Sequence, residues 1–270
     1  MNFFGMYWWQ ALVLGLVQGL TEFLPVSSSG HLILVRQFMG LNDAASSQFN
    51  RLFDIMVHVG TLAAVLIVLY KEVISLFKKP FKRLGMLVVA CIPAVIVGFA
   101  CGDFIDGYFS DATYLCFFFL FTAVIMLVSE IVAKRNKNPK ELGWGGAVAM
   151  GVMQGVGVFP GVSRSGSTIF GGTLAGTDSK KVATFSFLMS IPIILGALFL
   201  DTIKIAKAGA LADIDWFNVT VGALSAFAAG YFAVRVMLKL IAKANYKWFS
   251  VYLLAVSVFS FVYYFIPSVI

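Results

Sequence analysis

Six long apolar stretches dominate the sequence and leave few folds open to it. They cover residues 53–70, 84–102, 113–133, 182–200, 217–238 and 249–267. Each is close to the roughly 20 residues that an α-helix needs to cross a bilayer. Only 12% of the 270 residues are Asp, Glu, Lys or Arg, whereas soluble domains carry about 25%. The chain is therefore predicted to be an all-α polytopic membrane protein with a single membrane domain and six spanning helices.

Two further apolar regions, residues 7–40 and 144–177, are interrupted near their middle by Pro, Gly and Ser. In each region a longer first arm is followed by an arm of about ten residues, which is too short to cross a bilayer. Irregular backbone at membrane depth is tolerated only where protein or a water-filled cavity surrounds it. We therefore expect two re-entrant helical hairpins in addition to the six spans.

The basic residues predict how the chain is oriented. If the loop after the first span faces the cytoplasm, alternation of the spans places 15 of the 20 Lys and Arg on that side. This agrees with the positive-inside rule. The rule also accounts for the net charge of +7, so the charge gives no reason to expect nucleic-acid binding. Both termini are then predicted to face outward.

An internal repeat relates the two broken regions. A shift of 136 residues aligns residues 15–33 with 151–169 without a gap, and nine of the 19 positions are identical. Three spans follow each hairpin, an odd number, so the second copy is predicted to be inserted upside down. Repeat one covers about 1–135 and repeat two about 140–270. The hairpin tips are expected to meet inside the membrane, where inverted repeats with broken helices place their binding sites.

The positions at which the two copies differ carry the ionisable groups. Copy one has Glu22 and His31, and copy two has Arg164 at the position equivalent to Ser28. Ionisable side chains within membrane segments cost at least about 2.5–3.5 kcal/mol and mark candidate functional sites. A purely structural Glu22–Arg164 ion pair is the alternative, but it leaves His31 and the serines unexplained.

The hairpin tips have the features of an anion site. Each short arm begins just after a Ser/Gly-rich turn, so that its free N–H groups and its helix dipole point at the tip. The guanidinium of Arg164 adds a planar fork suited to phosphate oxygens. Further hydroxyl donors are expected from Ser27, Ser163, Ser165 and Thr168, although serines at helix starts often serve only as N-caps. A phosphate or a diphosphate is the predicted ligand.

A metal site is predicted beside the anion site. Gln18 and Glu22 are four residues apart and share one face of the first arm. Their oxygens suit a hard cation, Mg²⁺ or Ca²⁺, that would bridge to a diphosphate with water completing its shell. The metal is expected to bind together with the ligand.

The first tip also carries a candidate for nucleophilic chemistry. His31 lies three residues after Ser28 and four after Ser27, so it is expected to reach either hydroxyl. Such a pair fits attack on phosphorus, with His31 as the general base or as the nucleophile itself. Asp54 and His58, four residues apart in the first span, are expected to support the site or to pack against it.

Two motifs resemble the signatures of the bacterial undecaprenyl-diphosphate phosphatases, also called bacitracin-resistance proteins. The motif TEFLPVSSSGH covers residues 21–31, and FPGVSRSGST covers 159–168. The family signatures are (E/Q)xxxE followed by PxSSxGH, and PGxSRSxxT. Length, span count and motif placement agree over the whole chain. The main variation is Gln18, where many members have a second glutamate, and its amide weakens any role of this position as a base.

This resemblance implies hydrolysis of undecaprenyl diphosphate to undecaprenyl phosphate and inorganic phosphate, which recycles the lipid carrier for peptidoglycan synthesis and confers bacitracin resistance. It implies a divalent cation, the bacterial inner membrane and a site open to the periplasm. Arg164 would bind the diphosphate, Glu22 would serve in metal binding or proton transfer, and Ser28 with His31 would act at phosphorus. A polyprenyl-phosphate flippase remains the alternative, and the sequence does not distinguish a monomer from a homodimer.

Overall fold

The computed structural model describes residues 6–41, 47–109, 112–207 and 215–266. These residues form helices and contain no β-strand, as predicted for the all-α class. The helices are α1 (Trp8–Thr21), α2 (Ser28–Phe38), α3 (Ser47–Val68), α4 (Tyr70–Leu76), α5 (Lys82–Phe109), a 3₁₀ turn (Ala112–Tyr114), α6 (Leu115–Arg135), α7 (Trp144–Val156), α8 (Arg164–Leu174), α9 (Ser179–Lys207), α10 (Trp216–Ile241) and α11 (Lys247–Phe265).

The six predicted spans correspond to the long helices α3, α5, α6, α9, α10 and α11. Five of them are long and apolar enough to cross a membrane alone, whereas α3 meets that test only together with α4. The described residues therefore contain five to six candidate spans. Large apolar side chains face outward from these helices, and Phe99, Phe232 and Trp248 are 72%, 66% and 67% exposed. Such an outer surface suits lipid as the surrounding solvent.

The short helix α4 corrects the sequence prediction, which placed a basic loop directly after the first span. The chain turns by 81° between α3 and α4 and then stays helical for seven residues. Leu76 is buried in the main core cluster and Val73 packs against it. This apolar contact holds the segment against the end of the bundle as a helix.

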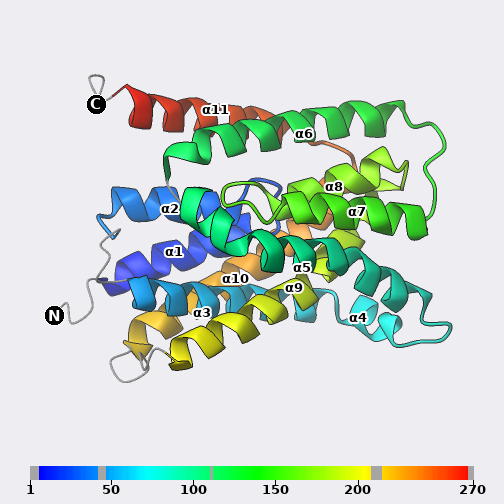
Figure 1. The fold of residues 1–270 in the computed structure, drawn as a ribbon. Helices are drawn as coiled ribbons and strands as arrows, with labels where there is room; N and C mark the ends of the chain where they lie inside the picture. Colours follow the sequence, from blue (N-terminus) through cyan, green and yellow to red (C-terminus); the bar gives the residue numbers. More distant parts are fainter. Residues whose placement is uncertain (1–5, 42–46, 110–111, 208–214, 267–270) are drawn as a thin grey trace.

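Four short helices form two pairs in the middle of the molecule. The first pair, α1 and α2, is joined by residues 22–27, and the second pair, α7 and α8, by 157–163. These helices have 11 to 14 residues, about 16–21 Å at 1.5 Å per residue, which is less than the roughly 30 Å of a bilayer core. Figure 1 shows the two pairs approaching from opposite ends of the molecule, with their loops together at the centre.

Each pair packs against a long helix from the other half of the chain. Helix α1 lies along α10, and α7 lies along α5. A Cβ added at Gly19 would lie 2.5 Å from the carbonyl oxygen of Ala226, and one at Gly151 would lie 2.6 Å from that of Ala90. Small residues at such crossings let membrane helices approach closely. The contacts in the two halves are therefore reciprocal.

The basic loops gather at one end of the molecule. Figure 1 places the connections α4–α5, α6–α7, α8–α9 and α10–α11 at this end, and the start of α1 and the end of α11 at the opposite end. The 15 basic residues assigned to one side by sequence lie in or beside these four connections. We call this end the basic end.

Candidate active site

Equivalent serines cap the second helix of each pair. The Oγ of Ser27 accepts a hydrogen bond from the backbone N–H of Gly30 at 3.3 Å, and the Oγ of Ser163 accepts one from that of Gly166 at 3.1 Å. Ser27 has a φ of 71°, a left-handed conformation that a non-glycine residue rarely adopts. Of the two roles expected for Ser27 and Ser163, capping is the one seen in this structure.

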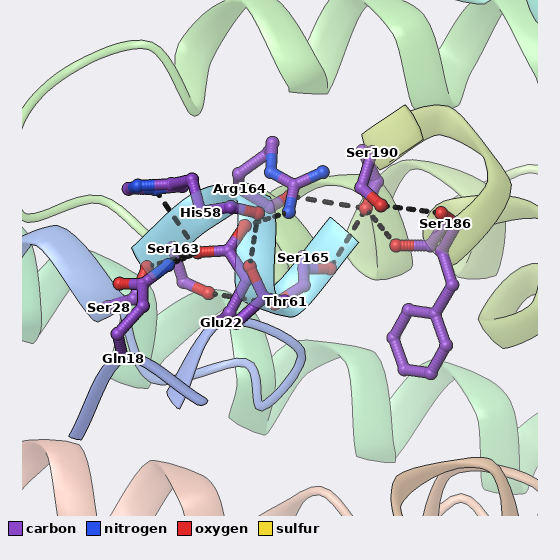
Figure 2. Close-up of polar contacts among 12 residues, drawn as sticks. Gln18, Glu22, Ser28, His58, Thr61, Ser163, Arg164, Ser165, Ser186 and Ser190 are labelled. Atoms are coloured by element: carbon purple, nitrogen blue, oxygen red, sulfur yellow. Dashed lines mark hydrogen bonds and ion pairs between the residues drawn. The ribbon is translucent and has the colours of Figure 1, made fainter. Parts of the chain in front are cut away.

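Glu22, at the C-terminal end of α1, lies at the centre of a buried polar cluster. Figure 2 shows the surrounding side chains converging on it. The Nη2 of Arg164 donates to Oε1 of Glu22 at 2.5 Å. The hydroxyl of Ser28 and the amide Nε2 of Gln18 donate to Oε2 at 2.7 and 2.9 Å. The structure thus brings together Gln18, Glu22, Ser28 and Arg164, from both helical pairs.

His58 on α3 completes this cluster. Its Nε2 lies 3.7 Å from Oε2 of Glu22, and its Nδ1 lies 2.6 Å from the backbone oxygen of Asp54. The Asp54 carboxylate forms an ion pair with both terminal nitrogens of Arg36 on α2. Sequence reasoning gave Asp54 and His58 a supporting or packing role and missed the direct approach of His58 to Glu22. Their spacing of four residues was the only signal for it.

His31 lies outside this cluster. Its Nδ1 is 2.7 Å from the backbone oxygen of Ser27, and its Nε2 is 2.7 Å from the hydroxyl of Tyr252 on α11. The His31 ring stacks on that of Tyr252 with 12° between the planes. The predicted contact of His31 with the Ser28 or Ser27 hydroxyl is absent between these described residues. Ser28 is the first residue of α2, and its side chain points to Glu22. The side chain of His31, one helical turn later, instead contacts the backbone oxygen of Ser27.

The remaining predicted hydroxyls hold the second tip in place. The Oγ of Ser165 donates to the backbone oxygen of Leu24 at 2.9 Å, which joins the two loops. The hydroxyls of Thr168 and Ser186 are 2.6 Å apart and join α8 to α9. The Thr168 hydroxyl also lies 3.1 Å from the backbone oxygen of Arg164, to which it donates, so these contacts hold the start of α8 against α9 and the first loop.

A cavity of about 190 Å³ reaches the Glu22–Arg164 pair. The polar residues that line it are Glu22, Asp54, His58 and Arg164, and the apolar ones are Ile55, Ile193, Ile194, Ala197 and Leu198. Pockets that enclose a drug-sized ligand have about 300–1,000 Å³, so this cavity suits a polar head group and not a whole lipid. A chain attached to that head group would follow the apolar side chains of α3 and α9.

The residues predicted to hold a metal fit a hard cation in part. The Oε1 of Gln18 is buried and has no hydrogen-bond partner among the described residues, and Gln18 is hydrogen-bonded to the Glu22 carboxylate. Amide and carboxylate oxygens are ligands that Mg²⁺ and Ca²⁺ prefer. The described residues contain no group of three or more His, Cys, Asp or Glu suited to a metal. Ligand or water oxygens would therefore have to complete the shell.

The fold and the site define an all-helical membrane protein in which two broken helical pairs meet at a buried acid–arginine cluster. Residues 11–259 match the sequence profile of the family described as bacitracin resistance protein BacA. The chain belongs to this family, as the resemblance of its two motifs predicts.

Curated relatives match over most of their length. An undecaprenyl-diphosphatase of Carboxydothermus hydrogenoformans is 42% identical over 238 residues, which are 87% of this chain and 89% of the relative. Proteins of the same name from Halothermothrix orenii and Treponema denticola are 38% and 39% identical, over 87% and 86% of this chain and 90% and 88% of the relatives.

Proposed function

We propose that this protein hydrolyses undecaprenyl diphosphate to undecaprenyl phosphate and inorganic phosphate. The observation that carries the proposal is the buried Glu22–Arg164 pair in the lining of a cavity that also has apolar side chains from α3 and α9. This arrangement suits a ligand with a charged head and an apolar chain, and the relatives are named undecaprenyl-diphosphatase. Their name gives no support to the flippase alternative.

Arg164 binds the diphosphate in this proposal. Its guanidinium lies at the start of α8, where the helix dipole also favours negative charge. Phosphate oxygens of the substrate would accept the hydrogen bond that Arg164 now donates to Oε1 of Glu22, while Ser28 keeps its hydrogen bond to Oε2. Phosphoryl transfer depends mainly on positioning and on the stabilisation of negative charge, and the cluster provides both.

Ser28 is the hydroxyl best placed to attack the terminal phosphorus. Its Oγ donates to Glu22, which orients the oxygen and accepts its proton as the P–O bond forms and undecaprenyl phosphate leaves. Water then hydrolyses the phosphoserine. The Oγ of Ser27 caps α2, and the ring nitrogens of His31 bond to Ser27 and Tyr252. His31 therefore holds the start of α2 in place and would have to leave Tyr252 to act as base or nucleophile.

Gln18 and Glu22 would hold a divalent cation, Mg²⁺ or Ca²⁺, through their side-chain oxygens. Such an ion supplies neutralisation of the diphosphate charge. The unpartnered buried Oε1 of Gln18 supports this assignment.

The membrane arrangement that goes with this function is a pair of inverted repeats, each a re-entrant hairpin followed by three spans, in the bacterial inner membrane. The opposite approach of the two helical pairs and their reciprocal packing support it. With the basic end in the cytoplasm, Asp54 lies in the half of α3 that faces away from it, and Ala197 and Leu198 of the cavity lie in the half of α9 that faces away from it. The cavity then opens towards the periplasm. One chain supplies every side chain of the cluster, so the site requires no homodimer.

Phosphate release from undecaprenyl diphosphate by the detergent-purified protein tests the proposal. We expect release from the diphosphate and none from undecaprenyl phosphate, loss of activity in EDTA, and recovery with Mg²⁺ or Ca²⁺. Activity that is unchanged by EDTA would remove the metal from the proposal. Tight binding of the lipid diphosphate without release would contradict the hydrolase itself.

A further inference from the structure

A second and larger cavity lies at the basic end of the molecule. It has a volume of about 530 Å³ and lies between α4, the start of α5, the residues before α7 and the start of α9. Helix α9 contributes to the lining of both cavities: Thr184 lines this one, and Ile193 lines the one at Glu22. These residues are nine positions apart, about 14 Å along a helix. The second cavity is therefore separate from the candidate active site.

Positive charge prevails in this cavity. The charged side chains that line it are Lys82, Arg83, Lys180, Lys181, Glu72 and Glu141. Arg83 is paired with Glu72 at 2.9 Å, and Lys181 with Glu141 at 3.3 Å. Within the described part of the chain, Lys82 and Lys180 take part in no ion pair. Two ammonium groups from different helices thus remain available for an anion.

The neighbouring helix α4 places this cavity at the level of lipid head groups. It is bent by 81° from α3, and Ile74 on it and Phe77 at its C-cap are 54% and 65% exposed. Phe81, just after it, is 45% exposed. Exposed apolar side chains on a short helix that turns away from a span suit a position in the membrane interface. Glu72 on the same helix lines the cavity, so the cavity lies beside this helix.

We propose that this cavity binds the phosphate group of an anionic membrane lipid, with Lys82 and Lys180 as its principal ligands. Basic pockets between membrane helices are sites where anionic head groups bind. Met86 and Leu142 give the cavity an apolar part, which suits an amphipathic ligand. Free inorganic phosphate has the same charge chemistry, but it makes no use of this apolar surface.

Native mass spectrometry of the full-length, delipidated protein tests this proposal with phosphatidylglycerol and phosphatidylcholine as probes. The variant Lys82→Gln/Lys180→Gln removes the two unpaired charges. The control Lys137→Gln/Lys243→Gln removes two charges from exposed lysines that do not line the cavity. We expect the cavity variant to bind phosphatidylglycerol at least about tenfold more weakly, since each lysine near the membrane surface contributes about fivefold. The control should stay close to wild type.

Two further readouts keep the test decisive. Hydrolysis in detergent should be unchanged in both double variants, because neither touches the Glu22 cluster, and this shows that they are folded. Millimolar inorganic phosphate should leave phosphatidylglycerol bound to wild type. The proposal is overturned if both double variants lose affinity equally, if phosphatidylcholine binds as well as phosphatidylglycerol, or if inorganic phosphate alone occupies the cavity.

Discussion

Arg164 donates a hydrogen bond to Glu22 at 2.5 Å across 142 positions of the sequence. One residue comes from each half of the chain, so neither half can form the site alone. Only 17% of the Arg164 side chain and 5% of the Glu22 side chain are exposed. Removal of one partner from a buried pair leaves an uncompensated charge. The pair therefore holds the two central loops together as well as defining the site.

Replacement of Arg164 by lysine keeps the charge but removes the planar fork. We expect kcat/KM for undecaprenyl diphosphate to fall by about 10²–10³, the scale of losing one well-placed donor to the transition state. The initial rate of phosphate release measures this. Arg235→Lys is the control, because Arg235 is exposed and stacks on Tyr231 far from the cluster in sequence. Activity of Arg164→Lys within about threefold of wild type would contradict a bidentate role.

Adjacent serines offer a matched test of the proposed nucleophile. Ser28→Ala removes the hydroxyl bonded to Glu22, and we expect kcat to fall at least about 10²-fold. Ser29→Ala removes a hydroxyl with two long contacts of 3.4 Å, one with the Ser27 hydroxyl and one accepted from the backbone N–H of Gly161, and it should change kcat by a few-fold at most. Single-turnover assays with acid-quench detection of phosphoserine measure both the rate and the intermediate. Equal effects of the two substitutions would assign the attack to another group.

The Arg36–Asp54 ion pair is expected to stabilise the contact between α2 and α3. Arg36→Met should lower the free energy of unfolding by about 2 kcal/mol, less than for a fully buried pair because a third of the Asp54 side chain is exposed. Arg83→Met breaks the more exposed pair with Glu72 and should cost at most about 1 kcal/mol. Thermal unfolding in one detergent compares the two. If Arg83→Met were the more damaging change, the structural role of Arg36 would be wrong.

The crossing of α1 and α10 depends on the absence of a side chain at Gly19. Its Cβ would lie 2.5 Å from the oxygen of Ala226 and 2.8 Å from the nitrogen of Gly230, so Gly19→Ala should destabilise the protein by about 1–3 kcal/mol. At Gly98, in α5, a Cβ meets no described atom within 4 Å beyond the neighbouring residues and backbone of its own helix. Gly98→Ala should be neutral or stabilising by up to about 1 kcal/mol. Melting temperatures that rise in both variants would contradict the close crossing.

The long helices could be predicted from the sequence because the thickness of a bilayer sets the length of an apolar run. The central cluster could be predicted for a different reason. Glu22 and Arg164 are positions at which the two copies of the repeat differ. Because the equivalent loops of the two copies meet, the ionisable side chains at these positions are expected to lie close together. The place of Gln18 in the cluster follows from its spacing of four residues from Glu22, and the place of Ser28 follows from its position just after the turn.

Features that depend on packing between distant elements could not be predicted. The bonding of His31 to Tyr252 joins α2 to α11, and no local pattern encodes the partner of a ring nitrogen. His58 comes close to Glu22 only because α3 packs beside the first helical pair. Helix α4 is short, and its stability comes from the burial of Leu76 and not from its own length.

The most direct measurement for the central claim is a double-mutant cycle on phosphate release with Glu22→Ala, Arg164→Ala and the combined variant, each verified as folded. Groups that act as one unit in catalysis are strongly non-additive. We predict that each single substitution abolishes nearly all activity and that the double variant is no worse than the more damaged single one. Independent, additive effects, or substantial activity in the double variant, would contradict a phosphatase site built on this pair.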